Sequence, residues 1–198
     1  MMEIQLKSLR VRNVHLDFDL SLEFDDGSTV GLSELDVDGL LVDEDNQFEG
    51  LRALNPLVGA ICSTAEVTTS GALVIGFGSR AVIRASPRDD VESWEYTAAS
   101  GATVLCLPGG EIEYLAAPEA RRAESHRPGL PAIDATAVRI SVGEDGGITF
   151  SDNTMIRTTV DLASAYLVLR ESVRAIRHLD GVHCLELSSG YVVRSSSP

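Results

Sequence analysis

The chain has 198 residues, of which 44% are hydrophobic and 23% charged, so it can bury a core and is not expected to be disordered. Its formal net charge of −14 at pH 7 argues against a general nucleic-acid-binding protein and against docking on an anionic membrane. We also find no membrane-spanning stretch, no signal-peptide pattern, and only three cysteines, which lack metal-ligand spacing. We therefore expect a reduced, cytoplasmic protein.

Alternation of apolar and polar residues dominates the sequence and predicts β-strands. The clearest case is 16–24, where Leu and Phe alternate with Asp, Ser and Glu, which predicts one long strand with a buried face and an acidic face. Turn-forming residues then separate successive strands. Three hairpins are predicted: 16–24 with 29–32, 72–77 with 81–84, and 103–107 with 111–114.

Helical signals are few. Apolar residues at helical spacing predict one short helix over 46–54, ending before Pro56, and a second over 161–170 with Asp161 as its cap. The segment 116–131 has three prolines and no apolar periodicity, so we predict a linker there. It separates an acidic β-rich domain, 1–115, from a smaller β-rich half with one helix, 132–198.

The second half resembles a diverged copy of the first. Residues 22–30 align with 148–156 at an offset of 126, and residues 71–86 align with 181–196 at an offset of 110. The second copy would then lack a segment of 16 residues, about 34–49. The predicted fold class is mainly β (α+β): two β-rich halves of antiparallel sheet, each with a short helix and related by duplication. The alternative is one continuous sheet or sandwich spanning both halves.

Acidic residues are concentrated near the N-terminus. Residues 1–115 carry 20 acidic and 7 basic side chains, and residues 13–51 contain twelve acidic residues with no Lys or Arg. The ordinary interpretation is a solubilising face. The alternative is a docking surface for a basic protein, whose association such charge would accelerate. The candidate partner-binding carboxylates are Asp17, Asp19, Asp36, Asp38, Asp43, Glu44 and Asp45.

Trp94, the only tryptophan, is followed by Glu95 and preceded by three acidic residues within five positions. It is either a core residue or an exposed aromatic anchor inside an acidic rim, the pattern of an interface hot spot. Trp94 and Glu95 therefore join the candidate partner-binding residues.

No pattern in the sequence predicts catalysis or a cofactor. Residues 36–45 resemble a calcium loop but lack a third acid before the glycine and a closing glutamate, so an acidic turn is expected. His178 and His183 flank a predicted hairpin turn, and two histidines without a third ligand make a weak zinc site. With no nucleophile elbow and no zinc motif, we expect no enzyme, no cofactor and no metal site.

Four pieces of the first domain occur in a characteristic order. They are the acidic strand and turn 16–27, Leu57-Val58-Gly59, Trp94-Glu95, and the stretch 104–111 (VLCLPGGE). Because of these four pieces, residues 11–115 resemble an uncharacterised family of small actinobacterial proteins, a domain of unknown function. The chain departs from that family where a tryptophan usually follows the two glycines, since Tyr114-Leu115 stands there. The resemblance implies no activity.

These observations predict an intracellular, non-catalytic binding protein of the immunity or inhibitor type. Its acidic surface would dock a basic protein such as a toxin or nuclease. The alternative is a small-molecule or peptide-binding module, with a cleft between the halves lined by Trp94, Tyr96 and Tyr114. A hydrolase using scattered carboxylates ranks last because no pair of carboxylates has a defined spacing. The oligomeric state stays open.

Overall fold

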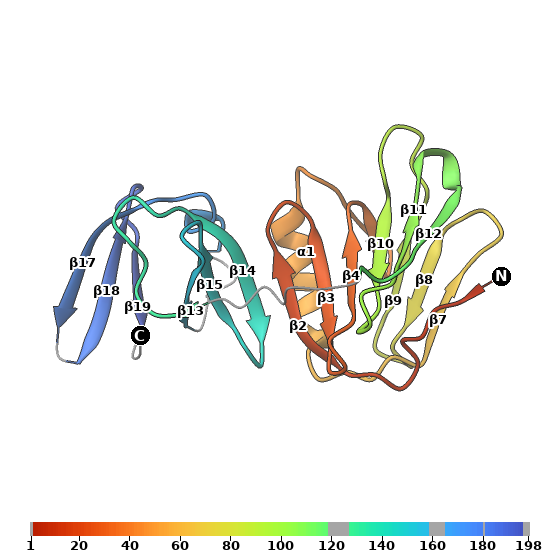
Figure 1. Cartoon of the computed structure of the whole chain (residues 1–198), viewed down its shortest axis with the longest axis horizontal. Helices are drawn as coiled ribbons and strands as arrows, with labels where there is room; N and C mark the ends of the chain where they lie inside the picture. Colours follow the sequence, from red (N-terminus) through yellow and green to blue (C-terminus); the bar gives the residue numbers. More distant parts are fainter. Residues whose placement is uncertain (1, 119–126, 159–164, 180, 196–198) are drawn as a thin grey trace. The chain divides into compact units, whose positions relative to one another are not determined.

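The computed structural model describes residues 2–118, 127–158, 165–179 and 181–195. The chain forms two compact units: one comprises Met1–Val14 with Phe18–Arg122, and the other His15–Asp17 with Ala123–Pro198 (Figure 1). Strands make up 48% and helical residues 9% of the structure, which confirms the mainly β prediction. Residues 119–126, in the middle of the predicted linker, lie outside the described residues, so the linker stays a prediction.

The first unit contains two antiparallel arrays of strands. One has the order β1-β7-β8-β9-β5-β6, and the other runs β12-β11-β10-β4-β3-β2. The strands are β1 Met2–Glu3, β2 Val11–Leu16, β3 Leu20–Phe24, β4 Thr29–Leu32, β5 Leu35–Val37, β6 Leu40–Val42, β7 Thr64–Val67, β8 Leu73–Gly76, β9 Val82–Ala85, β10 Trp94–Thr97, β11 Thr103–Cys106 and β12 Ile112–Leu115. All three predicted hairpin turns are present, as β3–β4, β8–β9 and β11–β12.

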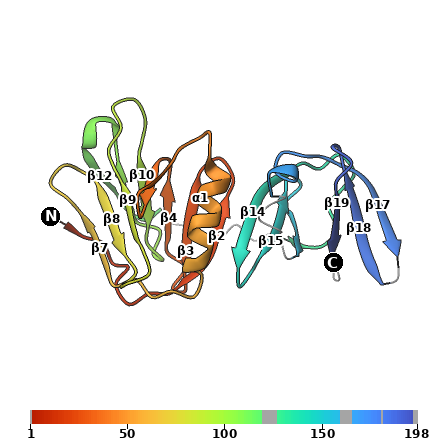
Figure 2. The same ribbon diagram turned by 180° about the vertical axis from the view of Figure 1, so that it is seen from behind.

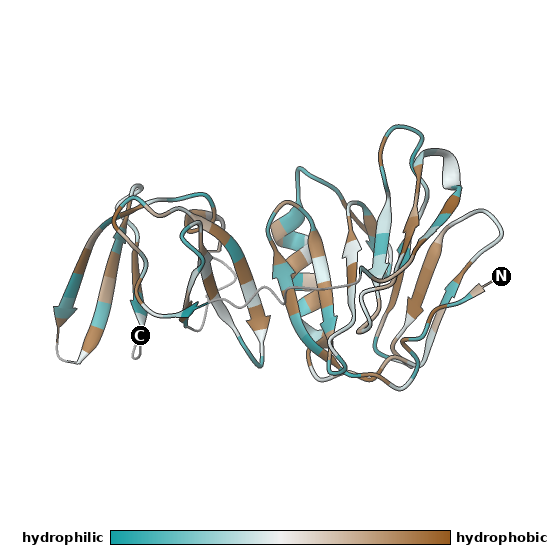
Figure 3. Ribbon diagram, in the orientation of Figure 1, coloured by the Kyte–Doolittle hydropathy of each residue, from teal (hydrophilic) through white to brown (hydrophobic). Residues whose placement is uncertain are grey.

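Alternation fixes which face of each strand is buried. In β3, Leu20, Leu22 and Phe24 are buried while Ser21 and Glu23 are half-exposed, and Figure 3 shows the same alternation of apolar and polar residues along the strand. The prediction of a single strand over 16–24 is wrong in one respect. β2 ends at Leu16 and β3 begins at Leu20, so residues 17–19 form a bend between two strands.

The predicted helix over 46–54 is confirmed as α1, Gln47–Leu54, continued by a 3₁₀ turn, η1, Asn55–Leu57. It contacts β3, as Figure 2 shows from behind, and also β5 and β6. Gly50 lies at the tightest approach. A Cβ built there would lie 2.4 Å from Leu20 Cδ1 and 2.5 Å from Val42 Cγ1, so only glycine lets the helix pack this closely.

Trp94 lies in the core and links β10 to the β7–β8 turn. Its side chain is 2% exposed, and its indole N–H donates to the Gly71 carbonyl at 2.9 Å. Gly71 has φ +85°, and a Cβ there would lie 2.5 Å from the Gly110 carbonyl oxygen. The turn Pro108–Gly110 (η2) between β11 and β12 therefore packs against the β7–β8 turn beside the indole.

The second unit has the arrays β14-β15-β16-β13 and β17-β18-β19. Its elements are β13 Arg127–Pro128, β14 Ala137–Gly143, β15 Gly147–Phe150, β16 Thr154–Arg157, η3 Ala165–Leu167, β17 Val173–Leu179, β18 Val182–Leu187 and β19 Val192–Ser195. The predicted helix 161–170 is not an α-helix where it is described. Only η3 forms, and the chain turns through Arg170 at φ 70°, a left-handed conformation that ends the helical turn. Residues 161–164 lie outside the described part of the chain.

The aligned hairpins of the two units share their turn in detail. In the first unit, Asp26 Oδ1 accepts from both the backbone N–H and the hydroxyl of Ser28, at 2.8 and 2.6 Å. In the second, Asp152 Oδ1 accepts from the same two groups of Thr154, at 3.1 and 2.6 Å. The residue between is left-handed in both, Gly27 at φ 85° and Asn153 at φ 67°.

The bridges next to these hairpins also correspond. Arg10 bridges Ile61 in the first unit and Thr136 bridges Ser172 in the second, at sequence offsets of 126 and 111. The first offset equals that of the aligned hairpins, and the second differs by one residue from the offset of 110 between 71–86 and 181–196. The duplication itself stays a prediction.

Candidate acidic docking surface

An open depression of about 600 Å³ lies in the first unit, beside the start of β3, the end of β4 and the start of β10. These three strand ends adjoin because Leu20 pairs with Leu32, and Leu32 with Trp94. The residues that line the depression are Asp19, Ser33, Glu44, Arg88, Asp90, Val91, Glu92 and Pro108. The lining therefore combines four carboxylates with one guanidinium and carries a net negative charge.

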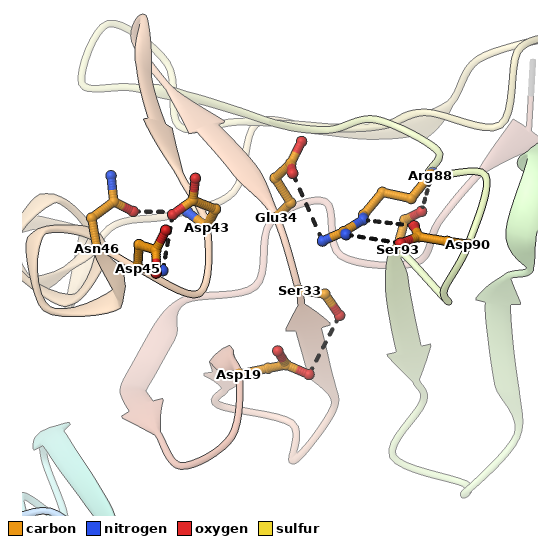
Figure 4. A network of polar contacts seen from close by, with 9 residues as sticks. All are labelled: Asp19, Ser33, Glu34, Asp43, Asp45, Asn46, Arg88, Asp90 and Ser93. Carbon is orange, nitrogen blue, oxygen red and sulfur yellow. Dashed lines mark hydrogen bonds and ion pairs between the residues drawn. The ribbon is translucent and has the colours of Figure 1, made fainter.

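Arg88 is the centre of the polar network in Figure 4. Its guanidinium forms ion pairs with Asp90 at 3.2 Å and with Glu34 at 3.8 Å, and its backbone N–H donates to Ser93 Oγ at 2.7 Å. The hydrogen bond from Arg88 lowers the pKa of the Asp90 carboxyl, and the bond to Asp90 together with its charge raises the pKa of the guanidinium. These contacts hold the loop in place beside the depression.

Asp19 and Glu44 approach the depression from other elements. Asp19 ends the bend before β3, and its Oδ2 accepts from Ser33 Oγ at 3.3 Å (Figure 4). Glu44 is exposed in the turn between β6 and α1. Of the predicted partner-binding residues, the structure brings these two together at the depression. Asp90 and Glu92 were not among the candidates, although their position before Trp94 in an acidic stretch was visible in the sequence.

Asp36 and Asp38 stabilise the β5–β6 hairpin. Asp36 Oδ1 accepts from the Gly39 N–H at 2.8 Å, and Asp38, at φ 52°, accepts from the Val82 N–H at 3.0 Å. This is the acidic turn expected at 36–45. Neither residue lines the depression, so both have a local structural task in addition to their charge.

Asp43 and Asp45 lie in the turn before α1. The Asp43 N–H donates to Asn46 Oδ1 at 2.8 Å, and Asp43 Oδ1 accepts from the Asp45 N–H at 3.0 Å (Figure 4). The Asn46 side-chain N–H donates to the Leu41 carbonyl at 2.9 Å. These contacts fix the turn that carries Glu44.

The other three candidates lie elsewhere. Asp17 belongs to the second unit. Glu95 is exposed in β10 but does not line the depression, and the Thr97 hydroxyl donates to it at 2.7 Å. Trp94 is buried, so of the two interpretations of this residue the structure supports core packing. Tyr96 is also buried, at 6% exposure, because it occupies the same face of β10 as Trp94.

The exposed aromatic residue of this region is Phe18, which the sequence pattern had assigned to the core. It is 82% exposed, between Asp17 and Asp19 in the bend that separates β2 from β3. The Gln47 side-chain amide donates to the Phe18 carbonyl at 2.6 Å, which ties the bend to α1. The flanking aspartates, the residue type favoured in turns, were the signal for a bend at this point.

We also examined the described part of the chain for metal sites, reactive thiols and membrane-spanning helices. No group of three or more His, Cys, Asp or Glu side chains there could hold a metal ion. Burial raises the pKa of Cys62 to about 11 and also raises that of Cys106, which makes both thiols poor nucleophiles. Within the same residues, no helix is long and apolar enough to cross a membrane.

Comparison with known proteins identifies the family. None of the curated proteins and none of the solved structures compared with the chain gives a significant match. A family model does match, over residues 2–116, and its description is "Family of unknown function (DUF6188)". It covers the region in which the family resemblance was recognised and more than half of the chain, so the protein belongs to the DUF6188 family.

Proposed function

We propose that the first unit is a non-catalytic binding module that docks a basic protein, in the manner of an immunity protein or inhibitor. The observation that carries this proposal is the depression, which is lined by Asp19, Glu44, Asp90 and Glu92 together with a single arginine. Because like charges gathered in this way repel one another, a cationic partner would relieve the repulsion on binding. Complementary charge of this kind accelerates association and selects partners.

A comparison of the two units supports a functional role for this charge. The alignments at offsets of 126 and 110 leave 26 residues of the first unit, 31–56, opposite 10 residues of the second, 157–166. The longer stretch contains seven acidic residues and one arginine, whereas the shorter one contains one of each. The second unit forms a hairpin with the same turn contacts as the first, although the sequence that follows its hairpin is shorter and less acidic.

Phe18 supplies the apolar anchor that the proposed interface needs. Charged rims raise the association rate and the specificity of an interface, whereas buried aromatic side chains supply much of the binding energy. Phe18 is next to Asp19, which lines the depression, and its bend is held by Gln47. A partner that covers the depression can therefore bury this ring in the same contact. We place the interaction in the cytoplasm, in keeping with three free cysteines.

The depression also gives the ligand-binding alternative its best support, because 600 Å³ is large enough for a small ligand. Its lining favours the protein partner. Val91 and Pro108 are its apolar residues, and the other six side chains are polar or charged. Ligand pockets are mostly apolar with a few polar groups, the opposite composition. An open, charged depression suits the Lys or Arg side chain of a protein.

The test is capture of partners from the native lysate by the full-length protein, with washes at low and high salt and identification by mass spectrometry. The variant D19N/E44Q/E92Q removes three charges from the depression and keeps hydrogen-bonding groups at each position. The control E3Q/E66Q/E113Q removes three charges from β1, β7 and β12, away from the depression. Circular dichroism would verify that both variants fold.

We expect one basic protein to be retained at low salt and released at high salt, and to associate at least about tenfold more slowly with the depression variant than with the control. F18A should then increase the dissociation rate with little effect on association. If the two charge variants bind the partner equally, the depression is not the docking site. If no basic protein is captured at low salt, the protein-docking proposal is contradicted and the small-ligand alternative is favoured. A ligand screen by thermal shift would then test that alternative.

A further inference from the structure

The second unit carries a pair of histidines that the proposed function does not use. His178 on β17 and His183 on β18 lie directly opposite each other in the antiparallel register. Their Nδ1 atoms are 3.4 Å apart, and their ring centroids are 4.6 Å apart with the planes tilted by 54°. One Nδ1 therefore donates a hydrogen bond to the other in one pair of tautomers, and an ion bound between the two nitrogens would take the place of that hydrogen bond.

This separation matches a tetrahedral metal ion. Two nitrogen ligands at the usual zinc distance of about 2.0–2.1 Å, with a tetrahedral angle between them, lie about 3.3–3.4 Å from each other. A right-angled pair of ligands, as in square-planar copper sites, would bring the nitrogens to about 2.9 Å at the same bond length. The observed distance of 3.4 Å fits the tetrahedral case.

The pair of histidines is accessible to solvent. His178 is exposed and His183 is half-exposed. His183 shares its face of β18 with Leu185 and Leu187, both buried, so the pair lies where the buried face of this sheet reaches solvent. Cys184 points to the opposite face, because neighbouring residues of a strand alternate, and is not positioned to join the two imidazoles.

We infer that His178 and His183 form a binding site for a divalent zinc-class ion, with water molecules in the two remaining tetrahedral positions. Each imidazole would bind the ion through Nδ1 and keep its proton on Nε2. The ion would tie β17 to β18 beside their turn. With two protein ligands, the affinity should be well below that of the four-ligand structural zinc sites.

The experiment uses the full-length protein without a histidine tag, at pH 7.5, with millimolar Mg²⁺ present to occupy carboxylate sites. Co²⁺ is the spectroscopic probe, because tetrahedral Co²⁺ absorbs visible light far more strongly than octahedral Co²⁺. Zn²⁺ binding is measured by titration calorimetry and by competition against the Co²⁺ band. The variants are H178A and H183A, with C184S as the control for the neighbouring thiol.

We expect one Co²⁺ per chain with a tetrahedral spectrum, displaced by Zn²⁺. Affinity should fall at least about tenfold in either histidine variant and be unchanged in C184S. An absent tetrahedral band in the wild type would overturn the inference. So would a band that survives H178A and H183A, since the ion would then occupy other groups. Unfolding curves recorded without metal should be alike for all four proteins, which separates loss of the site from loss of the fold.

Discussion

Replacing Arg88 by Gln gives the most direct test of how charge acts in the depression. Arg88 is the one cation among the residues that line it, facing four carboxylates. If the depression receives a cationic group, Arg88 opposes that group, and its removal should strengthen binding. If Arg88 instead organises the carboxylates that bind the partner, its removal should weaken binding. The sign of the change therefore separates two mechanisms.

The size of the change follows from Coulomb's law. Two unit charges about 8 Å apart in water interact with an energy close to RT, which corresponds to about a two- to threefold change in a dissociation constant. Arg88→Gln should lower the dissociation constant by this factor for each cationic group that enters, and Asp90→Asn should raise it by a similar factor. The fold should tolerate both changes, because exposed ion pairs such as Arg88 with Asp90 contribute little stability.

A fluorescent hexa-arginine peptide serves as the probe, with binding measured by anisotropy at 20 mM salt and again at 0.5 M salt. The two variants should differ in opposite directions at low salt. They should converge on the wild type at high salt, because charges are then screened within a few ångströms. Weaker binding by Arg88→Gln would refute the reasoning, as would a difference that persists at 0.5 M salt.

Three further outcomes are expected. Gly59→Ala should lower the free energy of unfolding by about 1–3 kcal/mol, because Gly59 has a left-handed backbone at φ +79° with open space around it. Gly71→Ala should lower the free energy of unfolding further, because the added Cβ would also meet a backbone carbonyl. Urea unfolding of both variants measures the difference. Ellman's reagent should label one thiol rapidly, that of Cys184, and the two buried thiols only after denaturation. Glu171 accepts hydrogen bonds from Ser188 and Ser189 that lower its pKa, so its contribution to stability is present above its unfolded pKa and lost as the pH falls through its lower folded pKa. The thermal midpoint of E171Q should therefore depend less on pH between 7 and 3.

The strand pattern was predictable from the sequence because alternation and turn chemistry agree. In β3 and β4, a buried position follows every half-exposed one, and the turn between them has an aspartate that caps a serine two residues later. Local rules were enough there, since each signal acts within a few residues. The same holds for α1, whose apolar residues at helical spacing, Leu51 and Leu54, are buried.

Local rules failed where contacts distant in the sequence decide the outcome. Phe18 continues the apolar alternation, yet the chain bends at residues 17–19 and exposes the ring, and a side chain 29 residues away holds the bend. Trp94 is surrounded by acidic residues in the sequence, yet its N–H is satisfied by a carbonyl 23 residues away. Core packing was one of the two interpretations of Trp94, and the aspartates beside Phe18 are turn-forming residues, but nothing near either residue in the sequence shows the distant partner that holds it.

The acidic residues illustrate the same limit at the level of the site. Their concentration in the sequence was plain, but the structure divides them by task. Asp36 and Asp38 hold a hairpin, Asp43 holds the turn before α1, and Asp19 and Glu44 line the depression. Asp→Asn removes the charge and keeps an acceptor oxygen, whereas Asp→Ala removes both. Loss of stability in the alanine variant but not in the asparagine variant would mark a structural carboxylate, and loss of salt-dependent binding in the asparagine variant would mark a docking one.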